Sequence, residues 1–209
     1  FVISNSISIQ VGEQVPFSAV HVIPGTIEAG HFDKYEAGAG QNISYFDTSQ
    51  YNEGDARLDE YVDTGSDSGE GITVGWITAG EWLEYSVDVQ NPGTYSIAIR
   101  YSSGNPNGGG PMYFELDGKS ISNSISFPTT GDWDEWATKT VTDIPITGGE
   151  QILRIAINNG EFNLGRMTFT QTGDLGFDPP VADAGPNVST VSSNTSVTLD
   201  GSGTYEPTG

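Results

Sequence analysis

The sequence contains no cysteine, and it has only 7 lysine and arginine residues against 28 aspartate and glutamate residues. The lack of cysteine excludes thiol chemistry. The shortage of basic residues leaves a net charge of −21 at pH 7, and such a charge repels nucleic-acid phosphates and anionic lipid surfaces. We therefore expect neither a nucleic-acid partner nor a membrane partner. Solubility or a salt-rich setting explains the acidity more simply than cation binding does.

Long apolar runs are also missing. No stretch approaches the ~18 consecutive apolar residues that cross a bilayer as a helix. The opening residues, FVISNSISIQ, are neither basic nor followed by a small-residue cleavage site, so they do not form a secretion signal. We expect the sequence to be the middle of a longer chain.

Motifs of catalysis are absent as well. His21 and His31 have no metal-ligand spacing around them, and neither a GxSxG nor a GxxxxGK string occurs. Glu81 and Glu84 are three residues apart, so on a regular strand they point to opposite faces and cannot act on one substrate. We interpret both as solvated carboxylates at a strand start. A glycan-cleaving domain that uses acidic residues from separate loops remains an alternative.

The 28 glycines and 11 prolines separate many short runs in which apolar and polar residues alternate. Alternation with period two indicates half-buried strands, and frequent turn signals are typical of an antiparallel β-sandwich or barrel. No window shows a convincing helical period. The clearest runs begin at Leu83, Tyr95, Met112, Ile121 and Leu153. The sequence therefore predicts an all-β fold.

The positions of these glycines and prolines divide the chain into one complete module between two incomplete neighbours. Residues 1–12 alternate like the last strand of a preceding β module, and the proline-punctuated residues 13–26 are interpreted as a linker. Residues 27–172 form the complete module. Residues 173–181 are a Pro-rich linker, and residues 182–209 are too short to close a core by themselves.

Tryptophans beside glycine-rich turns are the most informative feature. Trp133 and Trp136 are three residues apart, so in an extended chain one faces inward and the other outward. A flat aromatic ring with nearby Asn, Asp or Glu side chains matches a pyranose, which has an apolar C–H face and a rim of hydroxyls. Composition alone leaves open whether Trp133 is such a platform or an ordinary partly buried residue.

Six strings in order resemble the family 6 carbohydrate-binding modules over about residues 27–171. They are PGTIEA (24–29), NEGDAR (52–57), VGWI (74–77), GEWLEY (80–85), TGDWDEW (130–136) and FNL (162–164). The resemblance implies a jelly-roll β-sandwich without catalytic activity. It also implies attachment to a secreted polysaccharide-degrading enzyme, either a glycoside hydrolase or a polysaccharide lyase.

In that family the sugar site lies in loops at one end of the sandwich. An aromatic residue of the V-G-Y/W-I string and the first tryptophan of the T-G-x-W-x-x-W string enclose a sugar ring, and the asparagine of the N-L-N-W string bonds its hydroxyls. The resemblance therefore implies that Trp76, Trp133 and Asn163 bind carbohydrate, whereas Trp82 and Trp136 are packing residues.

Two departures affect this sugar site. The family often has a sugar-contacting glutamate upstream of the V-G-Y/W-I string, and Asp63 is its nearest substitute here. The family's N-L-N-W string reads NLGR (163–166) in this chain. Arg166 is thus a further carbohydrate-binding candidate, which either adds a donor or fills space.

A third departure affects a metal site. The family's opening I-E/Q-A-E string, whose acidic groups help to hold a structural calcium, reads IEAG (27–30) in this chain. Glu28 is the remaining candidate ligand. Since Ca²⁺ takes 6–8 oxygen ligands, the loss of one carboxylate implies weaker binding or completion by carbonyls and water.

The flanking segments resemble modules of extracellular proteins. The strings PPVADAGP and VTLDGSG near the C-terminus look like the start of a polycystic-kidney-disease-type Ig-like module, and residues 1–12 are similar to the last strand of an Ig-like or fibronectin-like spacer. These likenesses imply a secreted, extracellular or cell-surface-attached protein. We expect a monomeric polysaccharide-binding module tethered to a catalytic domain. A calcium-stabilised structural or adhesive spacer with a vestigial sugar site is the alternative.

Overall fold

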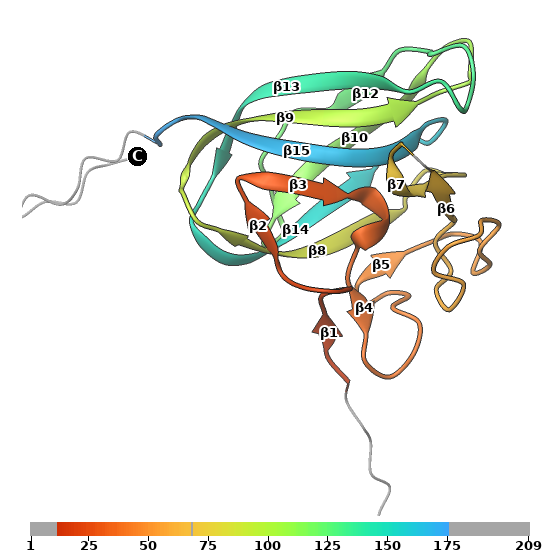
Figure 1. Ribbon diagram of the computed structural model, residues 1–209, viewed down its shortest axis with the longest axis horizontal. Coiled ribbons are helices and arrows are strands. Elements are labelled where there is room, and N and C mark those ends of the chain that lie inside the picture. The colour runs from red at the N-terminus through yellow and green to blue at the C-terminus, as the bar shows by residue number, and fades with distance from the viewer. Residues whose placement is uncertain (1–11, 68, 176–209) are drawn as a thin grey trace, which may run out of the picture. The chain divides into compact units, whose positions relative to one another are not determined.

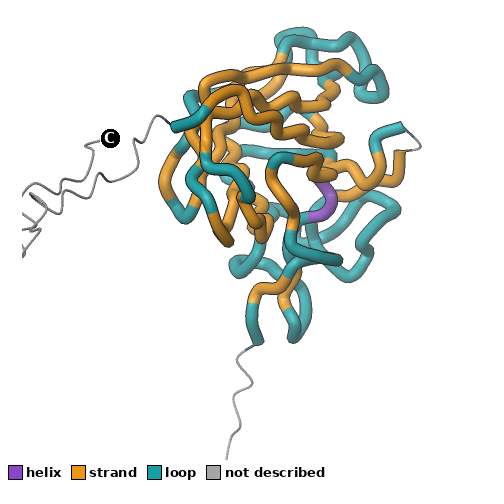
Figure 2. The backbone as a smooth tube through the Cα atoms, turned by 60° about the vertical axis from the view of Figure 1, so that its left-hand side comes forward, coloured by secondary structure: helices purple, strands orange, loops and turns teal. Residues whose placement is uncertain are grey.

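Strands provide nearly all of the regular structure in the computed structural model, which describes residues 12–67 and 69–175 (Figure 1). Figure 2 shows one short helical turn, the 3-10 segment Ala29–His31, among the strands. No helix in this described part is long and apolar enough to cross a membrane. The all-β prediction is confirmed. The expectations for residues 1–11 and 176–209, which include most of the expected linker 173–181, lie outside the described residues.

One sheet of the sandwich has the strand order β11-β10-β14-β8-β2, with β12 beside β10 and β5 beside β8. Its pairs are antiparallel except for β2, which runs parallel to β8. Its strands are β2 (His21–Ile23), β5 (Tyr45–Phe46), β8 (Trp82–Val89), β10 (Gly109–Leu116), β11 (Lys119–Ser120), β12 (Ile125–Phe127) and β14 (Gly149–Ile157).

The facing sheet has the order β13-β9-β15-β7-β6, with β3 on β15. Its strands are β3 (Gly25–Glu28), β6 (Thr64–Asp67), β7 (Gly71–Val74), β9 (Gly93–Ser102), β13 (Ala137–Ile146) and β15 (Asn163–Gly173). A separate two-stranded pair joins β1 (Gln14–Val15) to β4 (Lys34–Tyr35).

Alternation builds the core between the two sheets. Side chains at every second position of β8 and β9 are buried and meet the inner faces of the opposite strands. The inward set on these two strands is Leu83, Tyr85, Val87, Val89, Tyr95, Ile97, Ile99 and Tyr101. Burial of each such side chain contributes about 1.5–3 kcal/mol to the free energy of unfolding. The alternating apolar residues that predict the strands are therefore also the main source of stability.

The expected linker over residues 13–26 is instead part of the folded sandwich. It contains β1, β2 and the start of β3, and Ile23 is fully buried. Phe17 lies against the guanidinium of Arg57, 4.4 Å from its ring centroid, and Phe32 covers the same guanidinium at 3.6 Å. The prolines and short runs suggested a linker because the partners of this segment are far away in sequence. The linker prediction is therefore wrong.

Glu81 and Glu84 are not solvated carboxylates, because they are only 7% and 8% exposed. Glu81 accepts hydrogen bonds from Thr78 N and from the Thr48 hydroxyl. Glu84 pairs with Arg154, whose Nε donates at 2.8 Å. Both carboxylates thus hold neighbouring segments together, and the prediction that they are solvated is wrong.

One end of the sandwich brings together three strand ends that are distant in sequence. Asn163, the first residue of β15, pairs with Ser102 at the end of β9, and Leu164 pairs with Val74 at the end of β7. The loop between β12 and β13 lies against the same end, where Thr130 N donates to Ser103 O. Side chains from these segments are thereby collected at one place.

The burial of the N-terminal segment can be tested on β2. We expect Ile23→Ala to lower the free energy of unfolding by about 2–5 kcal/mol, because it leaves a cavity in the core. Val22→Ala on the same strand is the matched control, since Val22 is 52% exposed and its loss should cost within about 0.5 kcal/mol. Urea unfolding measures both, and equal stability of the two variants would restore the linker interpretation.

Candidate functional site

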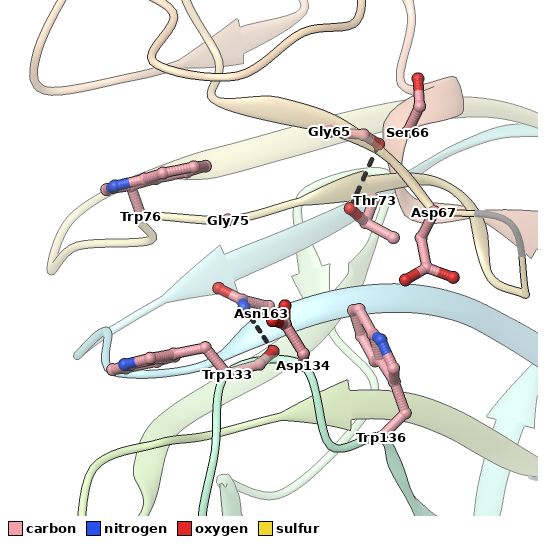
Figure 3. A pocket seen from close by; sticks show the side chains of 10 residues that line it. All are labelled: Gly65, Ser66, Asp67, Thr73, Gly75, Trp76, Trp133, Asp134, Trp136 and Asn163. Atoms are coloured by element: carbon pink, nitrogen blue, oxygen red, sulfur yellow. Dashed lines mark hydrogen bonds between the residues drawn. The ribbon is translucent and has the colours of Figure 1, made fainter.

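A pocket of about 430 Å³ opens at the end of the sandwich where β7 and β9 end and β15 begins (Figure 3). Its wall is formed by Gly65–Asp67 of β6, by Thr73, Gly75 and Trp76 in and after β7, by residues of the 133–136 loop, and by Asn163. Residues from four separate parts of the chain therefore line one pocket.

Trp76 follows β7 and is held in an uncommon conformation. Its φ is +47°, in the left-handed region that few large side chains adopt and that costs about 1–3 kcal/mol. The turn is fixed because Gly75 N donates to Asp63 O at 2.8 Å. With 60% of its surface exposed, the indole projects from the protein rather than into the core.

Trp133 is 42% exposed and is anchored through its backbone. Its carbonyl accepts hydrogen bonds from the Ser102 hydroxyl and from Asn163 Nδ2, the latter at 3.3 Å. Its ring lies over Gly104, where an added Cβ would come within 2.7 Å of the indole nitrogen. The absence of a side chain at position 104 thus lets the indole lie against the segment that follows β9.

Figure 3 shows the rings of Trp76 and Trp133 on the same side of the pocket with a gap between them. Asn163 lies beside this gap, and its described hydrogen bonds, to Ser102 and to Trp133 O, use only Nδ2. The amide oxygen is therefore available to accept a hydrogen bond from a ligand. Two flat apolar faces with an amide acceptor match the two kinds of surface that a sugar ring presents.

Asp63, predicted to contact sugar, does not line the pocket and is only 4% exposed. Its Oδ1 accepts a hydrogen bond from Glu53 N at 2.5 Å. Burial raises the pKa of Asp63 to about 6, and the nearby carboxylates of Asp47 and Glu81 add to this effect. The sugar-binding prediction for Asp63 is wrong because the side chain is enclosed by the loop that precedes β6.

Arg166 also stays outside the pocket wall. Its Nη1 donates to Gly69 O at 2.8 Å and lies 3.0 Å from Glu70 Oε2. Of the two roles expected for Arg166, the structure therefore corresponds to a packing and pairing role rather than to a donor in the pocket.

Sequence reasoning named three of the residues that line the pocket and missed the others, among them Ser66, Asp67, Thr73, Asp134 and Trp136. The resemblance assigned Trp136 to packing, in agreement with the argument that only one of Trp133 and Trp136 faces outward in an extended strand. Residues 131–134 instead form bends before β13 starts at Ala137, so alternation does not apply. The sequence did carry a signal for Trp136, because the family's N-L-N-W string has Gly165 as its third residue here. A Cβ at position 165 would meet the Trp136 ring at 3.2 Å, so glycine makes room for this ring.

Comparison with known proteins agrees with this geometry. The family model described as "Carbohydrate binding module (family 6)" matches residues 50–171, more than half of the chain. The chain belongs to this family. It is a non-catalytic, sugar-binding module with the β-sandwich fold that the family shares.

Two curated relatives and one solved structure illustrate the family likeness. The chain is 33% identical over 91 residues to an exo-beta-D-glucosaminidase of Amycolatopsis orientalis, a match over 43% of this chain and 9% of that protein. It is 30% identical over 122 residues to an alpha-agarase of Thalassotalea agarivorans, a match over 53% of this chain and 8% of that protein. The chain thus spans less than a tenth of either relative.

The solved structure is a family 6 module from Clostridium stercorarium in complex with cellobiose. It has a TM-score of 0.55 and 18% sequence identity, and the match covers 74% of this chain and 99% of that one. At this identity the likeness shows the fold alone.

Glu28, the candidate calcium ligand, is already engaged by neighbouring groups. Glu28 Oε2 accepts a hydrogen bond from Ile72 N at 3.0 Å and lies 3.3 Å from His31 Nε2. A Cβ at Gly30 would come within 2.1 Å of Ile72 Cγ2, so no carboxylate can stand there. No group of three or more His, Asp or Glu side chains suited to a metal occurs in the described residues. A calcium ion at Glu28 would therefore need carbonyl and water oxygens to reach six to eight ligands.

The raised pKa of Asp63 predicts a pH-dependent stability. Because the folded pKa, about 6, exceeds the usual value near 3.9, the folded protein holds the proton more tightly than the unfolded chain. The contribution of Asp63 to the free energy of unfolding therefore falls as pH rises from about 4 to about 6. We expect Asp63→Asn, which keeps the acceptor for Glu53 N, to be roughly 1–3 kcal/mol more stable than the parent at pH 7.

Urea unfolding at pH 7, 5 and 4 measures this difference between the variant and the parent. The difference should shrink towards pH 4, where the parent's carboxyl is protonated. Asp59→Asn is the control, since Asp59 is exposed. A difference for Asp63→Asn that stays constant across the three pH values would contradict the raised pKa.

Proposed function

We propose that this module binds a polysaccharide by stacking a pyranose ring between Trp76 and Trp133, with Asn163 bonding the hydroxyls of the ring. The observation that carries the proposal is that both indoles are exposed, at 60% and 42%, while they line one pocket. Buried indoles would serve packing alone. Exposed ones in a concave site offer apolar surface that a sugar face can cover.

We further propose that binding keeps a secreted glycan-degrading enzyme, a glycoside hydrolase or a polysaccharide lyase, on its substrate. A sugar ring offers little apolar area, and its hydroxyls exchange water for protein partners, so one site binds weakly. Tethering turns weak binding into a high effective concentration of substrate at the linked catalytic domain. The fixed turn at Trp76 and the anchored carbonyl of Trp133 limit the ordering cost of binding.

The names of the curated relatives support this role, since one is called a glucosaminidase and another an agarase. Each is far longer than the matched segment, as expected for a module attached to a catalytic domain. An extracellular location follows for the proposed parent protein, because polymeric glycans are too large to enter a cell intact. A single pocket on one chain requires no second copy, so we propose a monomeric module.

The stacking role predicts that Trp133→Ala abolishes measurable glycan binding and leaves the fold intact. The variant loses one face of the ring-binding gap, while Ser102 and Asn163 still bond the residue's carbonyl. Electrophoretic retention in gels containing candidate polysaccharides measures binding, and circular dichroism checks the fold. Tyr51→Ala is the matched control, because Tyr51 is 65% exposed and lies outside this pocket. Unchanged retention of Trp133→Ala would refute the stacking proposal.

Calcium binding stays a prediction, and so does the alternative of a calcium-stabilised spacer with a vestigial sugar site. Thermal melting distinguishes the sugar-binding module from the calcium-stabilised spacer, because a ligand that binds only the folded state raises the melting temperature. With Glu28 as the only carboxylate at the expected site, we expect a small difference between EDTA and millimolar Ca²⁺, and a rise with the recognised glycan. A steep rise with Ca²⁺ and none with any glycan would favour the spacer.

A further inference from the structure

The pocket has a second part that carries negative charge. Figure 3 shows Asp67 and Trp136 on the side of the pocket away from the rings of Trp76 and Trp133. We call the part formed by Ser66, Asp67, Thr73 and Trp136 the acidic arm. The charged side chains that line the pocket are Asp67 and Asp134, and no described lysine or arginine lines it.

Asp67 presents a fixed, ionised carboxylate. Its Oδ1 accepts hydrogen bonds from Gly69 N at 2.7 Å and from Glu70 N at 3.0 Å. These backbone bonds, that of Gly69 above all, hold the pKa of Asp67 below its usual range, and the Trp136 side chain and the Arg100 guanidinium add to the effect. No hydrogen bond to Oδ2 occurs within the described residues, so this oxygen is left for a ligand.

Trp136 places an aromatic ring next to this carboxylate. Its indole nitrogen is buried and makes no hydrogen bond of regular geometry within the described residues, but it lies near enough to Asp67 to favour the ionised carboxylate. The ring has room because position 165 is glycine, where a Cβ would meet the ring at 3.2 Å and Glu70 Oε2 at 3.1 Å. An indole face attracts cations, and the attraction grows where water is partly excluded.

Two nearby arginines do not line the pocket. Arg100 Nη2 lies 2.6 Å from Glu70 Oε1, and Arg166 Nη1 lies 3.0 Å from Glu70 Oε2. Glu70 is only 5% exposed, and both guanidinium groups pair with its carboxylate. Arg100 is nevertheless close enough to Asp67 to contribute to its lowered pKa. The described side chains that line the acidic arm itself are anionic, polar and aromatic.

We propose that the acidic arm receives a protonated amino group of a sugar, so that the pocket prefers glycans built from free hexosamines over uncharged or acidic glycans. A carboxylate and an ammonium group form a charge-assisted hydrogen bond, and the Trp136 face adds a cation–π attraction. A hydroxyl in the same place donates a hydrogen bond to the carboxylate but carries no positive charge. A uronate or sulfate there is repelled. The inference rests on the proposed function, because Trp76 and Trp133 hold the ring.

Calorimetry with three short β-1,4 oligosaccharides of equal length tests this preference: one of glucosamine, one of N-acetylglucosamine and one of glucose. At about pH 6 the sugar amine is protonated. We expect the glucosamine oligomer to bind about fivefold more tightly than the other two in low salt, with a smaller advantage in high salt. In Asp67→Asn, which keeps the Oδ1 acceptor, the ratio of the affinities should fall to about one.

Glu150→Gln is the matched control for general attraction to the net charge of −21. Glu150 is exposed and lies on β14 opposite Asp88, towards the other end of the sandwich. It should leave the affinity ratio unchanged. Equal affinity for the amine and glucose oligomers, a ratio that survives Asp67→Asn, or an equal drop in Glu150→Gln would overturn the inference while sugar binding stands. Failure of every oligosaccharide and polysaccharide to bind would overturn the proposed function and this inference together.

Discussion

The binding end of this molecule depends on how the carbonyl of Trp133 is held. Ser102 closes β9 and Asn163 opens β15, and both donate to that one oxygen. The loop that carries Trp133 is therefore fastened to two central strands of the facing sheet rather than to its neighbours in sequence. The same Asn163 stands beside the gap between the indoles, so one side chain both positions the aromatic wall and faces the ligand. A glycine at position 75 allows this, because a Cβ there would stand 3.3 Å from Asn163 Oδ1.

Much of the fold was predictable because alternation reports burial directly. The apolar runs beginning at Leu83, Tyr95 and Leu153 coincide with β8, β9 and β14. What alternation cannot report is pairing between distant segments. The residues 21–23 were assigned to a linker because their partner is β8, more than sixty positions later, and because that pairing is parallel. A three-residue strand carries too little pattern to reveal a partner at that separation.

The candidate site was likewise predictable only in part. Trp76, Trp133 and Asn163 came from ordered strings of residues, and the structure brings these three together in one pocket. Asp63 was chosen because spacing along the chain cannot distinguish an enclosed carboxylate from one in a pocket wall, such as Asp67. The resemblance assigned Trp136 to packing, and the alternation argument that agreed with it assumes a strand where the chain bends. Both errors arise in loops, where direction depends on local hydrogen bonds such as those of Gly69 and Glu70 with Asp67.

β15 has a consequence for the geometry of the whole protein. It begins at the pocket with Asn163 and runs for 11 residues to Gly173, and an extended strand of that length covers roughly 35 Å. The polypeptide therefore leaves this module at the end remote from the ligand. The last residue of β15, Gly173, is thus separated from the ligand by the full length of the sheet, and no part of that strand end crowds the mouth of the pocket.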